Sequence, residues 1–183
     1  DTTITPKAPR TPAEMREAGL FHVPEDRHHR GLVLPFDAAA NSILGFQDAA
    51  LAGTGMFLDQ GAIDARAAEQ VREFDVRPPL THLRASQYSG GNQQKLVLAR
   101  EISARPLVLL VGQPTRGVDI GAIEFIYKRL VALRSDGCAI LLVSVELEEV
   151  MSLADRILVM NDGCQIGLVR RRDCDEKSLG LMM

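Results

Sequence analysis

Two continuous apolar runs and the helical pattern between them dominate the second half of the chain. Residues 107–111 and 139–143 are apolar throughout and too short for the face of a helix, which is typical of fully buried parallel strands. Between them, apolar residues recur at helical spacing from Ile120 to Leu133, and Gly137 ends the pattern. The order of strand, helix and strand predicts a parallel sheet with a right-handed crossover.

The first half of the chain combines a short strand with helical stretches. Residues 19–23 are predicted to form a strand that stops at Pro24, and the charged residues 25–30 are predicted to form a loop. Residues 37–83 are rich in alanine and carry apolar residues at helical spacing. This pattern predicts a helical lobe, with Gly53-Thr54-Gly55 as an internal loop.

The carboxyl-terminal part is predicted to form a helix and a hairpin. A helix is expected over residues 146–153, and residues 156–160 and 164–169 flank Asn161-Asp162-Gly163. This turn sequence typically connects two antiparallel strands. The basic run at residues 170–172 is followed at once by acidic residues, which favours a solvated tail over a binding patch.

Composition restricts the class of protein. The chain has 183 residues, of which 46% are hydrophobic and 25% charged, enough to bury one sizeable core. Its net charge of -3 argues against the broad basic face that duplex nucleic acid requires, so no nucleic-acid partner is expected. Three cysteines without a CxxC pair support neither a disulfide framework nor a zinc site. No apolar run approaches the roughly 18 residues that span a bilayer.

The first candidate site is the glycine-rich element, residues 89–94 (SGGNQQ), with a helix expected from Asn92 to about Ser103. A hydroxyl and flexible backbone amides at the amino end of a helix favour a phosphate, because orphan N–H groups and the helix dipole act together there. An ordinary helix cap with a glycine turn explains the same three residues Ser89 to Gly91. Taken alone, the element favours that simpler explanation.

The next motif changes the balance. The apolar run is followed by residues 112–119 (GQPTRGVD), so YSGGNQQK, LVLLVGQPT and RGVD occur in that order. The arrangement resembles the ATP-binding cassettes of ABC transporters, with their signature, Walker B strand and D-loop. Residues 23–27 (VPEDR), followed by residues 30–32 (RGL), look like the Q-loop region of the second cassette in duplicated sugar and nucleoside importer ATPases. The resemblance covers about residues 18 to 169, and residues 113–126 favour the nucleoside-type or lipoprotein-dependent branch.

The resemblance implies a fold and a division of the chain. The fold class is α/β, a partial P-loop NTPase core of the ABC ATPase type with a parallel sheet and an inserted α-helical subdomain. Residues 1–36 would be a partial core with the Q-loop region, and residues 37–105 the helical signature subdomain. Residues 106–183 would complete the core with the Walker B strand, the D-loop, the H-loop position and the terminal hairpin.

Departures from the family pattern fall on the groups that hold magnesium and activate water. Gly112 stands at the Walker B aspartate, and Gln113 replaces the glutamate expected to polarise water. Val145 stands at the H-loop histidine and offers no hydrogen bond to a γ-phosphate. The resemblance therefore implies no intact catalytic residue and no metal site on this side of the cassette.

The phosphate-binding loop is also missing from this sequence. None of the four lysines is preceded by glycine, so no GxxxxGK[ST] motif is present. The chain begins without methionine, inside a polar stretch rich in threonine and proline, and without a basic and apolar leader pattern. We expect a truncated chain whose phosphate loop lies upstream of residue 1, and which hydrolyses no ATP alone.

ABC cassettes work as head-to-tail pairs, so the resemblance implies that this chain serves ATP held by a partner cassette. The implied contacts to that ATP come from Ser89, Gly90, Gly91, Asn92 and Gln93, with Asp119 in the D-loop and Glu25 in the Q-loop region. ATP with Mg is expected in the full assembly, and neither for the isolated fragment. The expected partners are the first cassette of the same polypeptide, two membrane permeases and, indirectly, an extracytoplasmic substrate-binding protein, at the cytoplasmic face of the inner membrane.

Several alternatives stay open at this point. A non-transport regulatory or scaffold cassette would carry the same motifs, and an autonomous ATPase would need the phosphate loop in the same fold. Glu25 is either a coupling residue or an exposed loop residue. His28-His29 are more typical of a solvated pair than of a metal site, and Glu148-Glu149 of an exposed helix face.

Overall fold

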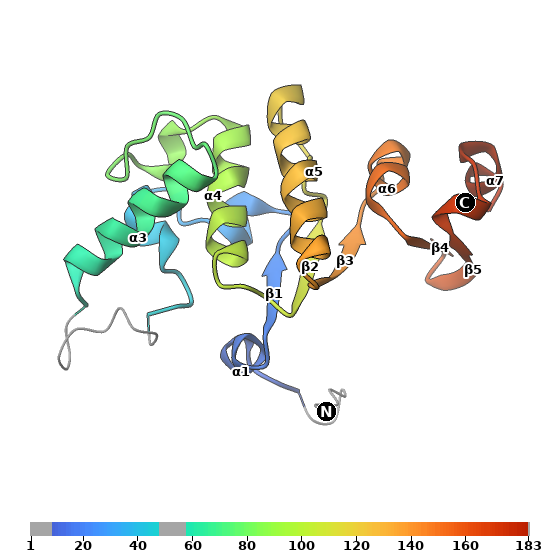
Figure 1. The fold of residues 1–183 in the computed structure, drawn as a ribbon, viewed down its shortest axis with the longest axis horizontal. Helices are drawn as coiled ribbons and strands as arrows, with labels where there is room; N and C mark the ends of the chain where they lie inside the picture. Colours follow the sequence, from blue (N-terminus) through green and yellow to red (C-terminus); the bar gives the residue numbers. More distant parts are fainter. Residues whose placement is uncertain (1–8, 48–57, 183) are drawn as a thin grey trace. The chain divides into compact units, whose positions relative to one another are not determined.

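The computed structural model describes residues 9–47 and 58–182 (Figure 1). The chain divides into two compact units, Asp1–Leu141 and Leu142–Met183. The loop predicted at Gly53-Thr54-Gly55 lies outside the described residues. The three-part division predicted at residues 36 and 105 stays a prediction.

A three-stranded sheet has the order β1-β2-β3, formed by Leu20–Val23, Val108–Gly112 and Ala139–Val143 (Figure 1). β1 and β2 are parallel, with Leu20 opposite Val108 and Val23 opposite Val111. The parallel sheet of the predicted fold class is confirmed by this pair, and the two apolar runs, β2 and β3, are neighbours in the sheet. Full burial was the wrong expectation for β3, which lies at the edge of the sheet and has no buried residue.

Helices of the first unit begin where side chains cap them. Thr11, Asp37, Asp59, Ser89 and Asp119 each accept a hydrogen bond from a backbone N–H of the first helical turn. Such caps satisfy donors that have no partner within the helix. The helices are α1 (Pro12–Glu17), α2 (Ala38–Ser42), α3 (Gln60–Glu73), α4 (Gly90–Ile102) and α5 (Ile120–Ser135), with the 3-10 turn η2 (Ala85–Gln87).

The predicted charged loop at residues 25–30 is in part helical. Arg27–Gly31 form a single π-helical turn, η1. Asp26 is the cap of this turn, and its carboxylate accepts hydrogen bonds from the backbone N–H groups of His28 and His29. The sequence pattern missed the turn because it is too short to show a periodicity.

Helix α4 runs through the core of the first unit and is buried on nearly all sides. Val97, Leu98 and Ala99 are fully buried, as is Glu101. Arg100 donates to the Glu101 carboxylate over 2.8 Å, and Arg16 of α1 lies 3.5 Å from it. The buried carboxylate therefore has two cationic partners, the arrangement that a charge in a core requires.

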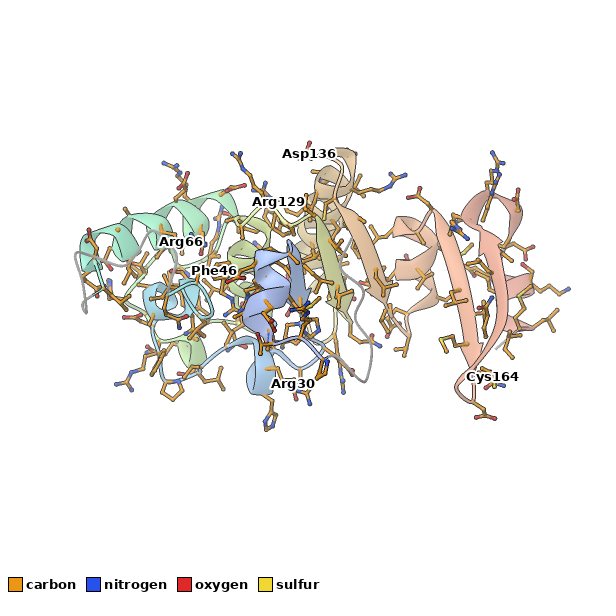
Figure 2. The ribbon with its side chains drawn as sticks, turned by 90° about the horizontal axis from the view of Figure 1, so that it is seen from below. Arg30, Phe46, Arg66, Arg129, Asp136 and Cys164 are labelled. Atoms are coloured by element: carbon orange, nitrogen blue, oxygen red, sulfur yellow. The ribbon has the colours of Figure 1, made fainter. Side chains whose placement is uncertain are left out.

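Arginine and aromatic side chains form a cluster in the first unit near α3. The ring of Phe46 stacks on Phe21 with centroids 5.8 Å apart. The guanidinium groups of Arg16 and Arg66 lie 5.0 and 5.2 Å from the Phe46 ring centre, and Figure 2 labels Phe46 and Arg66 in this cluster. Such contacts stabilise partly buried guanidinium groups.

The second unit contains α6 (Leu147–Leu153), the antiparallel strands β4 (Arg156–Asn161) and β5 (Cys164–Arg170), η3 (Arg171–Asp173) and α7 (Glu176–Gly180). Asp162 and Gly163 connect the strands, both with positive φ, 46° and 76°. Two left-handed residues in a two-residue loop are what the predicted Asn-Asp-Gly hairpin requires. Figure 2 labels Cys164 beside this turn. Ile157, Val159 and Leu179 form the core of the unit.

Two expectations for the second unit hold only in part, since Glu148, Arg170 and Arg172 are exposed as predicted but Glu149 and Arg171 are not. Glu149 is buried, at 1% exposure, although its position on a short helix after a strand predicted an exposed face. Arg171 does not belong to a free tail, because its guanidinium donates to the carbonyls of Met151 and Cys174. The terminal segment therefore packs on its own unit.

Candidate functional site

The glycine-rich element forms the amino end of α4, and Ser89 is its cap. The Ser89 hydroxyl accepts from the backbone N–H of Asn92 at 3.4 Å and from the Asn92 side-chain amide at 2.8 Å. The Asn92 side-chain carbonyl accepts from the backbone N–H of Arg77 at 2.7 Å. The helix starts two residues before the predicted Asn92, since the cap at Ser89 allows both glycines to be helical.

Both glycines are in close contact with other backbone or side-chain groups. A Cβ at Gly90 would lie 2.7 Å from the carbonyl oxygen of Gly117, and one at Gly91 would lie 2.9 Å from the Cβ of Ala122. Only glycine allows this approach. Within the described ranges, no acceptor is found for the backbone N–H groups of Gly90 and Gly91. The first turn of α4 thus keeps two orphan donors.

Gln93 connects α4 to two neighbouring elements. Its side-chain amide donates to the carbonyl of Ala85 at 3.0 Å, and its side-chain oxygen lies 2.8 Å from His28 Nε2. Gln93 is buried, whereas His28 is exposed. The expectation of a merely solvated histidine pair was therefore incomplete, because His28 makes a specific contact across the site.

The segment after β2, residues 113–119, turns back toward α4. Gln113 has a left-handed backbone with φ 46°, and its carbonyl accepts from the backbone N–H of Arg116 at 3.1 Å. At its end Asp119 caps α5 by accepting from the backbone N–H of Ala122 at 3.0 Å. The Asp119 carboxylate also lies next to Gly91, 2.6 Å from where a Cβ would be. The D-loop position and the glycine-rich element are therefore in contact.

Gly112, at the end of β2, faces the backbone of Glu25. A Cβ at residue 112 would lie 3.1 Å from the Glu25 backbone nitrogen and 3.4 Å from its Cβ. Glu25 itself is exposed and pairs with Arg116 at 2.5 Å. A surface ion pair of this kind contributes little stability, but it places residue 25 beside the segment after β2.

Arg27 belongs to the predicted Q-loop region, residues 23–27, but the sequence assigned it no role of its own. Its guanidinium donates to the carbonyl oxygens of Arg116 at 2.7 Å and of Gly117 at 3.3 Å. Partial burial lowers the pKa of Arg27, an effect that the neighbouring carboxylate of Asp26 opposes. For Asp26, the backbone hydrogen bond from His29 is the largest cause of its lowered pKa.

The structure brings most of the predicted residues together. Glu25, Gly112, Gln113, Asp119 and the residues of the glycine-rich element all belong to the first compact unit. Val145 belongs to the second unit and is 73% exposed. Among residues 9–47 and 58–182, no three His, Cys, Asp or Glu side chains gather to hold a metal ion.

Comparison with known proteins identifies the kind of protein. No family model matches the chain. The nucleoside import ATP-binding protein NupA of Lactococcus lactis is 44% identical over 172 residues, 94% of this chain and 34% of that protein. The guanosine import ATP-binding protein NupO of Bacillus subtilis is 43% identical over 174 residues, again 94% and 34%. The chain thus spans about a third of the length of the curated relatives it matches. It is related to the ABC import ATP-binding proteins.

Solved structures agree with this relationship at the level of the fold. The ABC transporter cassette MJ1267 has a TM-score of 0.73 at 17% identity, with 96% of this chain and 72% of that chain covered. The cassette MJ0796 bound to ADP and phosphate has a TM-score of 0.69 at 19% identity, with 89% and 68% covered. The chain has the ABC ATPase cassette fold, a P-loop NTPase fold. In the part of the cassette that is described, no helix is long and apolar enough to cross a membrane.

Proposed function

We propose that this cassette belongs to an importer for nucleosides or simple sugars and lends its glycine-rich element to ATP bound by a partner cassette. The relatives named above are import ATP-binding proteins for nucleosides, and a xylose import ATP-binding protein, XylG of Geobacillus kaustophilus, is 39% identical over 93% of the chain. The partner would be the first cassette of the same polypeptide. Two permeases and an extracytoplasmic binding protein would complete the assembly.

The observation that carries the proposal is the first turn of α4. The N–H groups of Gly90 and Gly91 have no acceptor in the described part of the chain, and the helix dipole points its positive end at the same place. An anion that arrives there is stabilised without reorganisation of the backbone. Ser89 is exposed, so its hydroxyl is accessible to a ligand from outside the chain.

The residues at the end of β2 do not fit a magnesium ion of their own. Gly112 has no ligating atom, and Gln113 has an amide in place of a carboxylate. Oxygen ligands with negative charge are what Mg²⁺ prefers. We therefore assign ATP and Mg to the partner's side of the assembly, and to this cassette the binding of the phosphates by backbone N–H groups.

Ser89→Asp in the full-length protein tests the donor role. Aspartate caps a helix as well as serine does, so α4 keeps its start, but a carboxylate now stands where the phosphate would bind. We expect transport-coupled ATPase turnover to fall by about tenfold or more through like-charge repulsion. Ser86→Asp is the matched control, because Ser86 is exposed in the 3-10 turn η2, three residues before Ser89 and outside the start of α4. Equal turnover in both variants would refute the donor role.

Restoring the missing groups tests whether this side of the cassette is silent. The triple variant Gly112→Asp, Gln113→Glu and Val145→His supplies the carboxylates and the imidazole that the family pattern contains. A strong loss of transport would show that the assembly requires this side of the cassette to be hydrolytically inactive, whereas faster ATP hydrolysis with normal transport would contradict that requirement.

Micromolar ATP binding to the isolated chain would favour an autonomous nucleotide site. ATP hydrolysis by the full-length protein at its normal rate in the absence of any permease would favour the regulatory or scaffold cassette.

A further inference from the structure

Arg27 makes contacts that no predicted motif accounts for. The guanidinium donates from Nη1 to the Arg116 carbonyl and from Nη2 to the Gly117 carbonyl, two consecutive carbonyls of one chain segment. A planar guanidinium suits two neighbouring acceptors, because each of its Nη atoms can donate to one of them at a fixed spacing. The contact joins residues that are 89 and 90 positions apart in the chain.

The same guanidinium also touches the start of α4. A Cβ built on Gly90 would lie 2.8 Å from Arg27 Nη2 and 2.7 Å from the Gly117 carbonyl oxygen. The Gly117 backbone is left-handed, with φ 64°, so its carbonyl position depends on a residue without a side chain. Arg27, Gly90 and Gly117 thus meet at one point, and each packs directly on the other two.

The backbone of Arg27 is itself held in place. Asp26 accepts the N–H groups of His28 and His29 and so fixes the first turn of η1. His28 then contacts Gln93 one turn into α4. The amino end of the π-helical turn is therefore attached both to α4, through His28, and to the segment after β2, through Arg27.

We propose that Arg27 is a positioning residue, which holds the Arg116–Gly117 backbone against Gly90 and so sets the relative positions of Asp119 and the first turn of α4. The inference rests on the proposed function, because those two groups are the ones assigned to a partner's ATP. Without the guanidinium, the two carbonyls lose their donors, and packing contacts with Gly90 and Gly91 are left to hold the segment after β2 against α4. The phosphate-binding N–H groups would then keep their chemistry but lose their placement relative to Asp119.

Hydrogen exchange of the full-length protein without nucleotide tests the clamp by itself. The reporters are the backbone amides of Arg116 and Val118, which donate to Gln113 and Thr115 within the segment. Arg27→Met keeps the length of the side chain and removes both donors. We expect exchange of this segment to rise about tenfold or more, since hydrogen bonds to a charged group are involved.

Arg30→Met is the matched control, because Arg30 lies on the same π-helical turn and is exposed (Figure 2). The described residues show no side-chain hydrogen bond or ion pair to it. We expect its exchange to equal that of the unmodified protein. Equal exchange in the Arg27 and Arg30 variants would overturn the proposal.

Arg27→Lys distinguishes the geometry of the two guanidinium donors from the effect of the positive charge. Lysine keeps the positive charge, but its donors sit on a single nitrogen and cannot reproduce the fixed spacing of Nη1 and Nη2, so we expect exchange to stay raised and transport-coupled turnover to stay about tenfold low. Full recovery in Arg27→Lys would overturn the clamp in favour of a simple charge effect. Raised exchange with normal turnover in Arg27→Met would also overturn it, because Arg27 would then be structural alone. Failure of the donor role appears instead as normal turnover in Ser89→Asp, whatever the exchange shows.

Discussion

Gly91→Ala is the sharpest test of the packing at the start of α4. Gly91 is the second residue of its helix, where alanine would normally stabilise by up to about 1 kcal/mol. Here the new methyl group would lie 2.9 Å from Ala122 Cβ, which cannot move without moving α5. The Asp119 Oδ2, at 2.6 Å, can move only if the carboxylate that caps α5 turns as well. Overpacking costs about 1–3 kcal/mol, so we expect a net loss of roughly 1–2 kcal/mol in the free energy of unfolding.

Two glycines at the equivalent helix position are internal controls. Gly61 in α3 and Gly121 in α5 are also second residues, and the nearest atoms to a Cβ there are the oxygens of their own capping aspartates, at 3.3 and 3.4 Å. Gly61→Ala and Gly121→Ala should be neutral or stabilising by a few tenths to about 1 kcal/mol. Urea unfolding of the full-length protein, followed by labelling of the buried Cys138 thiol, measures all three. The packing argument is refuted if Gly91→Ala stabilises as the controls do.

Two further predictions concern charged groups. Arg100→Met should lower the free energy of unfolding by about 3 kcal/mol. This is the lower end of the cost of breaking a buried ion pair, because Arg16 still faces the Glu101 carboxylate. Denaturant midpoints measure the change, and a loss below about 1 kcal/mol would contradict the prediction. The hydrogen bond from Arg77 is the largest cause of the lowered pKa of Asp75. The stability that the lowered pKa of Asp75 contributes is fully present above the unfolded pKa of about 3.9 and is lost as the pH falls through the folded pKa. Asp75→Asn should therefore make the free energy of unfolding fall less steeply below about pH 4, as acid titrations of unfolding would measure.

Hydrophobic patterns and turn residues in the sequence were sufficient to predict most of the helices and strands. β3 was predicted to the residue because its apolar run follows the helix-ending Gly137 closely and stops at Ser144. The hairpin at Asp162-Gly163 followed from turn chemistry, since both residues must tolerate positive φ. The start of α4 was misplaced by two residues, because glycine has low helix propensity and the pattern could not weigh the cap at Ser89 against it.

The parts that sequence reasoning missed depend on contacts between distant residues. Glu101 and Glu149 are buried although a charged residue on a helix is exposed by default. For Glu101, two arginines from different places in the chain make burial tolerable, and no periodicity encodes their meeting. Arg27 is a similar case: its partners are backbone carbonyls, which every residue has, so no residue type marks the position.

Gly112, which replaces the family's aspartate at the end of β2, is in contact with other residues of the site. Gly112 lacks a carboxylate, but it also leaves room for the backbone of Glu25, which would lie 3.1 Å from a new Cβ. Glu25 is tied to Arg116, and two residues further on Arg27 holds the Arg116 carbonyl. A carboxylate introduced at residue 112 would therefore push on the segment that positions Asp119. If that is so, Gly112→Asp alone should raise the exchange of residues 113–119 in the absence of nucleotide, which separates a steric effect from restored metal binding.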